Sequence, residues 1–246
     1  MKRVTLGRTD LEVSAICLGS MTWGSQNTED AAHAQLDRSL DAGIDFVDTA
    51  EVYPVNPIAK ETVGRTEEYI GTWNAKGGRD RIILATKHSG AGMQHVRDGA
   101  PITAETIPGA VEGSLRRLQT DYIDLYQFHW PNRGSYMFRQ NWSFDPSAQD
   151  REAIVSNMED CLVALQKLVV EGKIRHFGLS NESAWGTAMW LEAAARVGGP
   201  RVISIQNEYS LLCRMYDTDL GELGHNEDVA LLAFSPLAAV FLTCKY

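Results

Sequence analysis

The stretch that decides the fold is residues 14–24, which read Ser-Ala-Ile-Cys-Leu-Gly-Ser-Met-Thr-Trp-Gly. Its apolar half, residues 14–18, predicts a buried strand. A Rossmann-type sheet carries the pattern G-x-G-x-x-G directly after such a first strand, and residues 19–24 do not match that pattern. Because the rest of the chain alternates strand and helix patterns, the sequence favours a (β/α)8 TIM barrel over an open doubly wound sheet.

Short apolar runs alternate with helical patterns along the whole chain. The predicted strands are residues 14–18, 45–47, 82–86, 123–128, 174–179, 202–206 and 229–234. The clearest helical patterns are residues 28–43, 106–118, 151–171 and 183–197. Strands that are apolar throughout are buried on both faces, which makes the sheet parallel. Residues 4–6 and 11–13 flank a turn and predict a small β-hairpin before the first parallel strand. We therefore expect one domain over residues 1–246.

The composition is that of an acidic globular protein. The chain has 246 residues, and 23 Lys and Arg against 32 Asp and Glu give a net charge of −9. This charge repels phosphate backbones and anionic lipid, so we expect no binding of nucleic acid or membrane. No run approaches the roughly 20 apolar residues that span a bilayer, and residues 4–10 lack the apolar core of a secretion signal. The four cysteines, Cys17, Cys161, Cys213 and Cys244, form no CxxC pair, which predicts reduced thiols in a cytoplasmic protein.

Four residues at or beyond the ends of predicted strands have the chemistry of a proton-transfer site. They are Asp48, Tyr53, Lys87 and His129. Barrel enzymes place their active sites at the carboxyl ends of the strands, so these side chains are expected at one rim. A free tyrosine is a weak acid with a pKa near 10. We expect the Lys87 ammonium, held by Asp48, to lower the pKa of Tyr53, and His129 to bind a substrate carbonyl.

The later strand ends offer a second kind of chemistry. Ser180, Asn181 and Gln206 supply hydroxyl and amide groups suited to a carboxamide, and Phe234 offers a flat face for an aromatic ring. His88 follows Lys87 directly, and adjacent strand residues point to opposite faces. We therefore expect His88 to face the outer helices rather than to bind a metal.

The sequence resembles the aldo-keto reductase family. The matching segments are residues 43–53 (GIDFVDTAEVY), Lys87 at its strand end, and residues 121–130 (DYIDLYQFHW), 172–175 (GKIR), 178–181 (GLSN) and 234–237 (FSPL). Within the family, residues 53–55 together with Glu61-Thr62, Gly64 and Thr66-Glu67 look most like the bacterial Tas-like branch. The resemblance covers nearly the whole chain.

The resemblance implies reduction of an aldehyde or ketone, a small-molecule carbonyl substrate, with NADPH (NADP). It implies that Tyr53 is the general acid, that Asp48 and Lys87 adjust the pKa of Tyr53, and that His129 orients the carbonyl. The cofactor-binding residues that it implies are Ser20, Met21, Thr22, Asp48, Ser180, Asn181, Gln206, Phe234, Ser235 and Leu237. Trp23 and Trp130 are expected to line the substrate pocket, and no metal is expected.

The chain departs from the family pattern near residue 246. The family barrel has eight strands and this sequence predicts about seven strand–helix units, so we expect an incomplete barrel that lacks the C-terminal unit and its contacts to the 2′-phosphate of NADP. Relatives usually carry glycine at the positions of Val240 and Cys244, and often at that of Ala239. The alternative function is a non-catalytic nicotinamide-binding or accessory protein on the same scaffold. The sequence does not decide between NADP and NAD, and it does not identify the substrate or the oligomeric state.

Overall fold

The computed structural model describes residues 1–243 and 245. The strands are β1 (Arg3–Thr5), β2 (Glu12–Ser14), β3 (Cys17–Gly19), β4 (Phe46–Asp48), β5 (Ile83–His88), β6 (Ile123–Phe128), β7 (Ile174–Ser180), β8 (Val202–Glu208) and β9 (Ala230–Phe234). The α-helices are α1 (Glu29–Asp41), α2 (Arg65–Trp73), α3 (Thr106–Leu118), α4 (Arg151–Val170), α5 (Ala184–Val197) and α6 (Asp219–Glu227). Among the described cysteines, Cys17, Cys161 and Cys213 are free thiols, and Cys244 lies outside the described residues.

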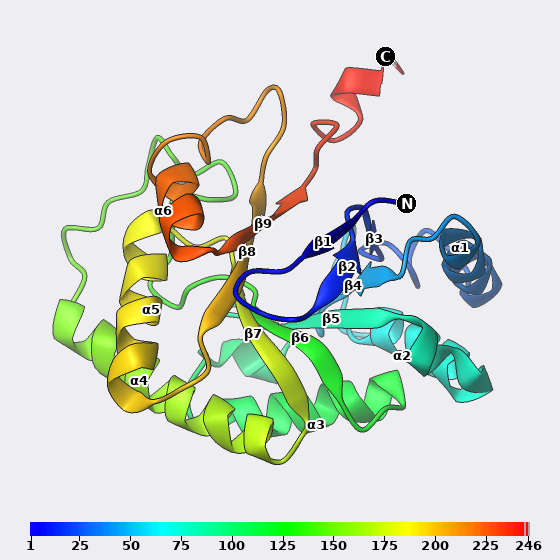
Figure 1. The fold of residues 1–246 in the computed structure, drawn as a ribbon, viewed down its shortest axis with the longest axis horizontal. Helices are drawn as coiled ribbons and strands as arrows, with labels where there is room; N and C mark the ends of the chain where they lie inside the picture. Colours follow the sequence, from blue (N-terminus) through cyan, green and yellow to red (C-terminus); the bar gives the residue numbers. More distant parts are fainter. Residues whose placement is uncertain (244, 246) are drawn as a thin grey trace.

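Strands β3 to β9 form a parallel sheet in sequence order. Within the described residues this sheet has seven strands, and each pairs in parallel with the next. The sheet curls into a half-barrel, and Figure 1 shows helices α1 to α6 around its outer side. The predicted barrel-type fold with about seven strand–helix units and an N-terminal hairpin is therefore confirmed.

The antiparallel hairpin of β1 and β2 closes the amino-terminal end of the half-barrel. Its Leu6 and Val13 are buried in one cluster with Phe46, Ala85 and Leu125, which lie early or midway in their strands. The turn approaches β8 so closely that a Cβ on Gly7, at a φ of 59°, would lie 2.5 Å from the carbonyl oxygen of Ile203. The hairpin thus leaves the carboxyl ends of the strands free for a site.

Some boundaries differ from those expected from the sequence. The predicted first strand, residues 14–18, is divided, because Ser14 ends β2 and β3 begins only at Cys17. Helices α2 and α6 were not expected. Neither has a side-chain cap, α2 follows Gly64 at a φ of 86°, and α6 contains Gly221 and Gly224, so the usual start signals are missing.

The larger core lies between the sheet and the helices. Alternate strand residues such as Val47, Leu84 and Tyr126 point outward into it, where they meet apolar residues of the helices. Phe128, Phe177 and Trp190 form an edge-to-face group in this layer. No helix in the described part of the chain is both long and apolar enough to cross a membrane.

Candidate active site

Strand alternation places the polar residues of the site directly above the hairpin. Phe46 and Ala85 point inward against the hairpin. Two residues further along each strand, Asp48 and Lys87 also point inward, because side chains on one face of a strand recur every second residue. The register pairs Lys87 with Gln127 of β6, so the same layer continues across the sheet.

Lys87 is fully buried and holds three oxygen atoms together. Its Nζ donates to Oδ2 of Asp48 at 2.6 Å and to the carbonyl oxygen of Thr49 at 2.8 Å, and it lies 3.4 Å from Oη of Tyr53. Burial lowers the pKa of Lys87, but the Asp48 carboxylate and Tyr53 raise that pKa by more, so it lies above its ordinary value. Lys87 therefore stays an ammonium ion at neutral pH.

Tyr53 is buried beside this ammonium and beside an imidazole ring. Its ring stands edge-on to His129 with centroids 5.6 Å apart. Burial raises the pKa of Tyr53 above 10, and the opposing effect of Lys87 does not cancel that rise. Lys87 acts on this pKa in the expected direction, but desolvation and the Asp48 carboxylate both disfavour the phenolate and outweigh it. Tyr53 keeps its proton at neutral pH.

His129 is neutral in the folded protein. Burial and the charge of Lys87 hold the pKa of His129 well below its ordinary value. Its backbone is fixed on both sides, because its N–H donates to the carbonyl oxygen of His88 and its own carbonyl accepts from Nδ2 of Asn181. The Nδ1 atom is buried and has no hydrogen-bond partner among the described residues.

The loop that carries Tyr53 is anchored to the loop after β5 by the buried carboxylate of Glu51. This carboxylate accepts from the backbone N–H of Ser89 at 2.5 Å and forms an ion pair with Arg97. Tyr53 also packs with Val52 and Val96. Two loops are therefore joined by both charge and apolar contact.

A cavity of about 730 Å³ opens at the carboxyl ends of the strands above these residues. Its polar side includes Asp48, Tyr53, His129, Ser180, Asn181 and Gln206. Its apolar wall includes Met21, Val52, Val55, Ile58, Met93, Trp130 and Phe138. The cavity thus joins a polar floor to a mainly apolar upper wall.

The structure brings most of the predicted site residues to this cavity. Those in the wall are Ser20, Met21, Asp48, Tyr53, His129, Trp130, Ser180, Asn181, Gln206, Phe234 and Ser235. Lys87 lies beneath the wall and reaches Asp48 and Tyr53 from below. His88, as expected, faces outward, with its ring edge-on to Phe128 and Nε2 3.4 Å from the Thr106 hydroxyl of α3.

Three predicted residues lie away from the cavity wall. Trp23, expected at the substrate pocket, is a core residue with 1% exposure, and its indole N–H donates to Gln35 at 3.1 Å. Thr22 donates its hydroxyl to Asn27 instead, and Leu237 is exposed outside the cavity. The chain turns at Met21 and Thr22, so Met21 lines the cavity while Thr22 and Trp23 point away from it.

The amide side chains at the rim are tied together through Asp48. Its Oδ1 accepts from Nε2 of Gln206 at 2.9 Å and from Nε2 of Gln127 at 3.1 Å. Asn181 has a φ of 54°, donates Nδ2 to Ser180 and leaves its buried Oδ1 without a partner among the described residues. Gln127 was not expected, although it lies two residues before His129 and in register with Lys87.

Comparison with known proteins gives one consistent family. A model of the Aldo/keto reductase family matches residues 15–246. Protein tas of Escherichia coli (strain K12) is 44% identical over 243 residues, which cover 97% of this chain and 68% of that protein. The uncharacterized oxidoreductase YrpG of Bacillus subtilis (strain 168) is 32% identical over 253 residues, which cover 100% of this chain and 69% of that protein. Aryl-alcohol dehydrogenase [NADP(+)] of Phanerodontia chrysosporium is 27% identical over 246 residues, which cover 93% of this chain and 56% of that protein.

The family match and the half-barrel describe the same architecture. The match begins at residue 15, directly after the hairpin, and runs through the whole parallel sheet. The chain therefore belongs to the aldo/keto reductase family, in the branch that contains protein tas, and so to a family of oxidoreductases.

Proposed function

We propose that this protein reduces an aldehyde or ketone to an alcohol with NADPH, and that Tyr53 is the general acid. One observation carries the proposal. A tyrosine that holds its proton lies 3.4 Å from a buried ammonium and edge-on to a neutral imidazole, at the floor of a cavity of about 730 Å³. These are the groups that protonate an oxygen as negative charge develops on it.

Each residue of this group has a distinct task. As the carbonyl oxygen gains negative charge, Tyr53 donates its proton from Oη to that oxygen. The ammonium of Lys87, held in place by Asp48, then stabilises the phenolate that is left behind. A neutral His129 carries one N–H, which it can donate to the carbonyl oxygen to orient it. Burial prevents bulk water from competing for these contacts.

The residues at the rim fit a nicotinamide cofactor. The buried Oδ1 of Asn181 lacks a donor among the described residues, and an amide N–H₂ is a suitable donor. Asn181, Ser180 and Gln206 would hold the carboxamide, and Phe234 would lie against the ring. When bound, the nicotinamide supplies the hydride. The relative from Phanerodontia chrysosporium carries NADP(+) in its name, which supports NADPH over NADH.

The cavity wall favours uncharged, apolar carbonyl compounds. Met21, Val55, Ile58, Trp130 and Phe138 supply its upper part, and no Lys or Arg lines it in the described part of the chain. An anionic substrate would therefore lose its hydration without gaining a cationic partner.

We place the proposed reaction in the cytoplasm, because the four cysteines form no CxxC pair and are typical of reduced thiols.

The test begins with binding and continues to turnover. NADPH and NADH are titrated separately into the purified chain while the fluorescence of each reduced cofactor is recorded. Benzaldehyde is then added, and the alcohol is measured as product. We expect saturable NADPH binding and formation of benzyl alcohol. Binding without turnover of any of a panel of aldehydes and ketones supports a non-catalytic nicotinamide-binding protein. Absence of binding of both cofactors rejects the reductase and supports a non-catalytic accessory protein.

A further inference from the structure

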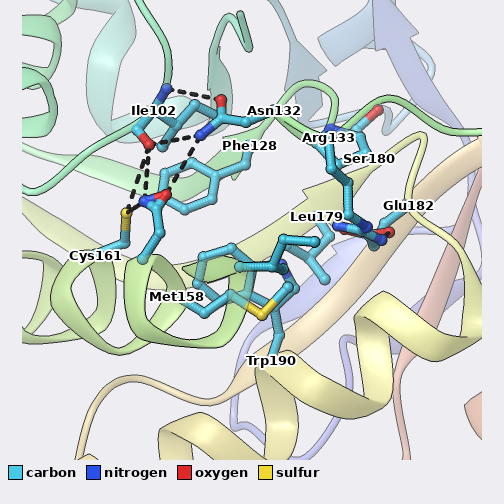
Figure 2. Close-up of a pocket in the computed structure, with 13 residues that line it drawn as sticks. Ile102, Phe128, Asn132, Arg133, Met158, Cys161, Leu179, Ser180, Glu182 and Trp190 are labelled. Atoms are coloured by element: carbon cyan, nitrogen blue, oxygen red, sulfur yellow. Dashed lines mark hydrogen bonds and ion pairs between the residues drawn. The ribbon is translucent and has the colours of Figure 1, made fainter. Parts of the chain in front are cut away.

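A buried ion pair lies behind the cavity wall, between Arg133 and Glu182. Their side chains are 8% and 2% exposed, and the contact is bidentate, with Nη1 of Arg133 2.9 Å from Oε2 of Glu182 and Nη2 bonded to Oε1. Figure 2 shows Arg133 reaching from its loop to Glu182 at the end of β7. Buried charges are tolerated in proteins when they are paired and hydrogen-bonded in this way.

Glu182 is linked to the residues that the proposed function assigns to the cofactor. It follows Asn181 directly, its Oε1 accepts from the backbone N–H of Ser183 at 2.6 Å, and its carbonyl oxygen accepts from Asn207 at 3.0 Å. Asn181 itself stands in the left-handed region, with a φ of 54°, which asparagine adopts more readily than most residues other than glycine. The hydrogen bonds of Glu182 therefore fix the backbone directly after this turn.

The loop of Arg133 is linked to the substrate side of the cavity. Trp130, Ser135 and Phe138 of this loop line the cavity. Ser135 also donates its hydroxyl to the carbonyl oxygen of Asn181 at 2.9 Å. The loop after β6 thus holds the end of β7 at two successive residues, Asn181 through Ser135 and Glu182 through Arg133.

Packing around the ion pair is uneven: Gly186 of α5 lies so close that a Cβ on it would be 2.2 Å from Nη2 of Arg133 and from Oε1 of Glu182. A cavity of about 60 Å³ lies against the ion pair, lined by Phe128, Met158, Cys161 and Trp190 among others. Figure 2 shows Arg133 and Glu182 on one side of this pocket and Phe128 and Cys161 on the other. The ion pair and its hydrogen bonds therefore fix the residues after β7 together with the close approach of α5.

We propose that Arg133 and Glu182 are positioning residues that join the two halves of the site. Their ion pair ties the loop that carries Trp130 and Phe138 to the strand end that carries Ser180 and Asn181, so the substrate wall and the cofactor-binding end are set as one unit. The assignment of these two halves rests on the proposed function.

The experiment compares three variants with the wild type. Glu182→Gln keeps the shape of the side chain and removes its charge. Because Glu182→Gln leaves Arg133 buried and unpaired, it lowers Tm, so the double variant Arg133→Met/Glu182→Gln is included to remove both charges. Glu192→Gln on α5 is the matched control, since Glu192 is exposed and its carboxylate forms a surface ion pair with Arg196 at 3.7 Å. The readouts are the NADPH Kd by fluorescence and backbone amide exchange of residues 133–137 and 178–183.

We expect Glu182→Gln to weaken NADPH binding about tenfold, because small displacements of binding groups are costly. The double variant regains the wild-type Tm but keeps the weak binding and the fast exchange of both segments, whereas the control matches the wild type. If the double variant binds NADPH and exchanges like the wild type, the pair is only structural and the inference is wrong. If the wild type does not bind NADPH, the proposed function fails, and the exchange data then decide alone whether the pair couples the two segments.

Discussion

Lys87 and Tyr53 show how burial and charge act against each other within one contact. The ammonium favours the phenolate, but the buried ring has lost its water, so the pKa of Tyr53 lies above its ordinary value. In the proposed reaction this arrangement suits a proton donor, because Tyr53 stays protonated until a stronger base, the reduced carbonyl oxygen, forms beside it. The charge of Lys87 is then available at the moment when the phenolate appears.

His88 predicts a pH dependence of stability. Burial lowers its pKa to about 4, with the charge of Arg97 acting in the same direction and that of Glu51 against it. Between this value and the ordinary value near 6.5, the unfolded state binds more protons, so stability is lost as the pH falls through that window. We expect His88 to account for a loss of roughly 2–3 kcal/mol between about pH 7.5 and about pH 4.5.

Urea unfolding at these two pH values measures this loss. In His88→Gln the difference between the two pH values is expected to shrink by about that amount, because Gln does not titrate. An equal loss in both proteins would show that other groups carry the pH dependence.

The strands were more predictable than the elements between them. Each apolar run marks a strand because a parallel strand is buried on both faces, and the register then brings Asp48, Lys87, Gln206 and Asn181 to one rim. Helix α2 escaped prediction because it is only 9 residues long and no side-chain cap marks its start. The pair of Arg133 and Glu182 carries no sequence signal, since its members lie 49 residues apart and meet only through the fold.

Two helix glycines predict opposite effects of the same substitution. In α2, a Cβ on Gly71 would lie 2.0 Å from the carbonyl oxygen of Arg117, so Gly71→Ala pushes α2 away from α3. We expect a loss of roughly 1–3 kcal/mol from this overpacking. In α3, Gly109 has open space at its Cβ position, so Gly109→Ala is expected to gain up to about 1 kcal/mol from helix propensity.

Thermal unfolding followed by circular dichroism compares these two variants with the wild type. We expect the Tm of Gly109→Ala to be the highest, that of the wild type to be intermediate and that of Gly71→Ala to be the lowest. An unchanged Tm in Gly71→Ala would mean that α2 and α3 are not closely packed at this point.

The whole molecule is layered from the hairpin to the cavity. The hairpin closes one end of the curled sheet, and the layer proposed to be catalytic lies two residues further along the same strands. Stability and chemistry are therefore separated along the strand direction, as in barrel enzymes generally.

Leu6→Ala tests this separation. Leu6 is 2% exposed in the hairpin cluster, so its truncation is expected to cost about 2–5 kcal/mol of stability. NADPH binding, measured well below the Tm of the variant, should stay within about twofold of the wild type, because Leu6 packs with Phe46 and Ala85 at the end of the sheet opposite to the cavity. A large loss of binding in a folded Leu6→Ala protein would show that the hairpin also shapes the site.

The central claim is that Tyr53 protonates the carbonyl oxygen, and Tyr53→Phe tests it most directly. The substitution removes Oη and keeps the ring against His129. Aldehyde-dependent NADPH oxidation is measured in parallel with NADPH binding by fluorescence. The account predicts a loss of turnover of roughly 10²–10⁴-fold with a Kd for NADPH within about twofold of the wild type. Turnover at the wild-type rate in Tyr53→Phe would contradict it.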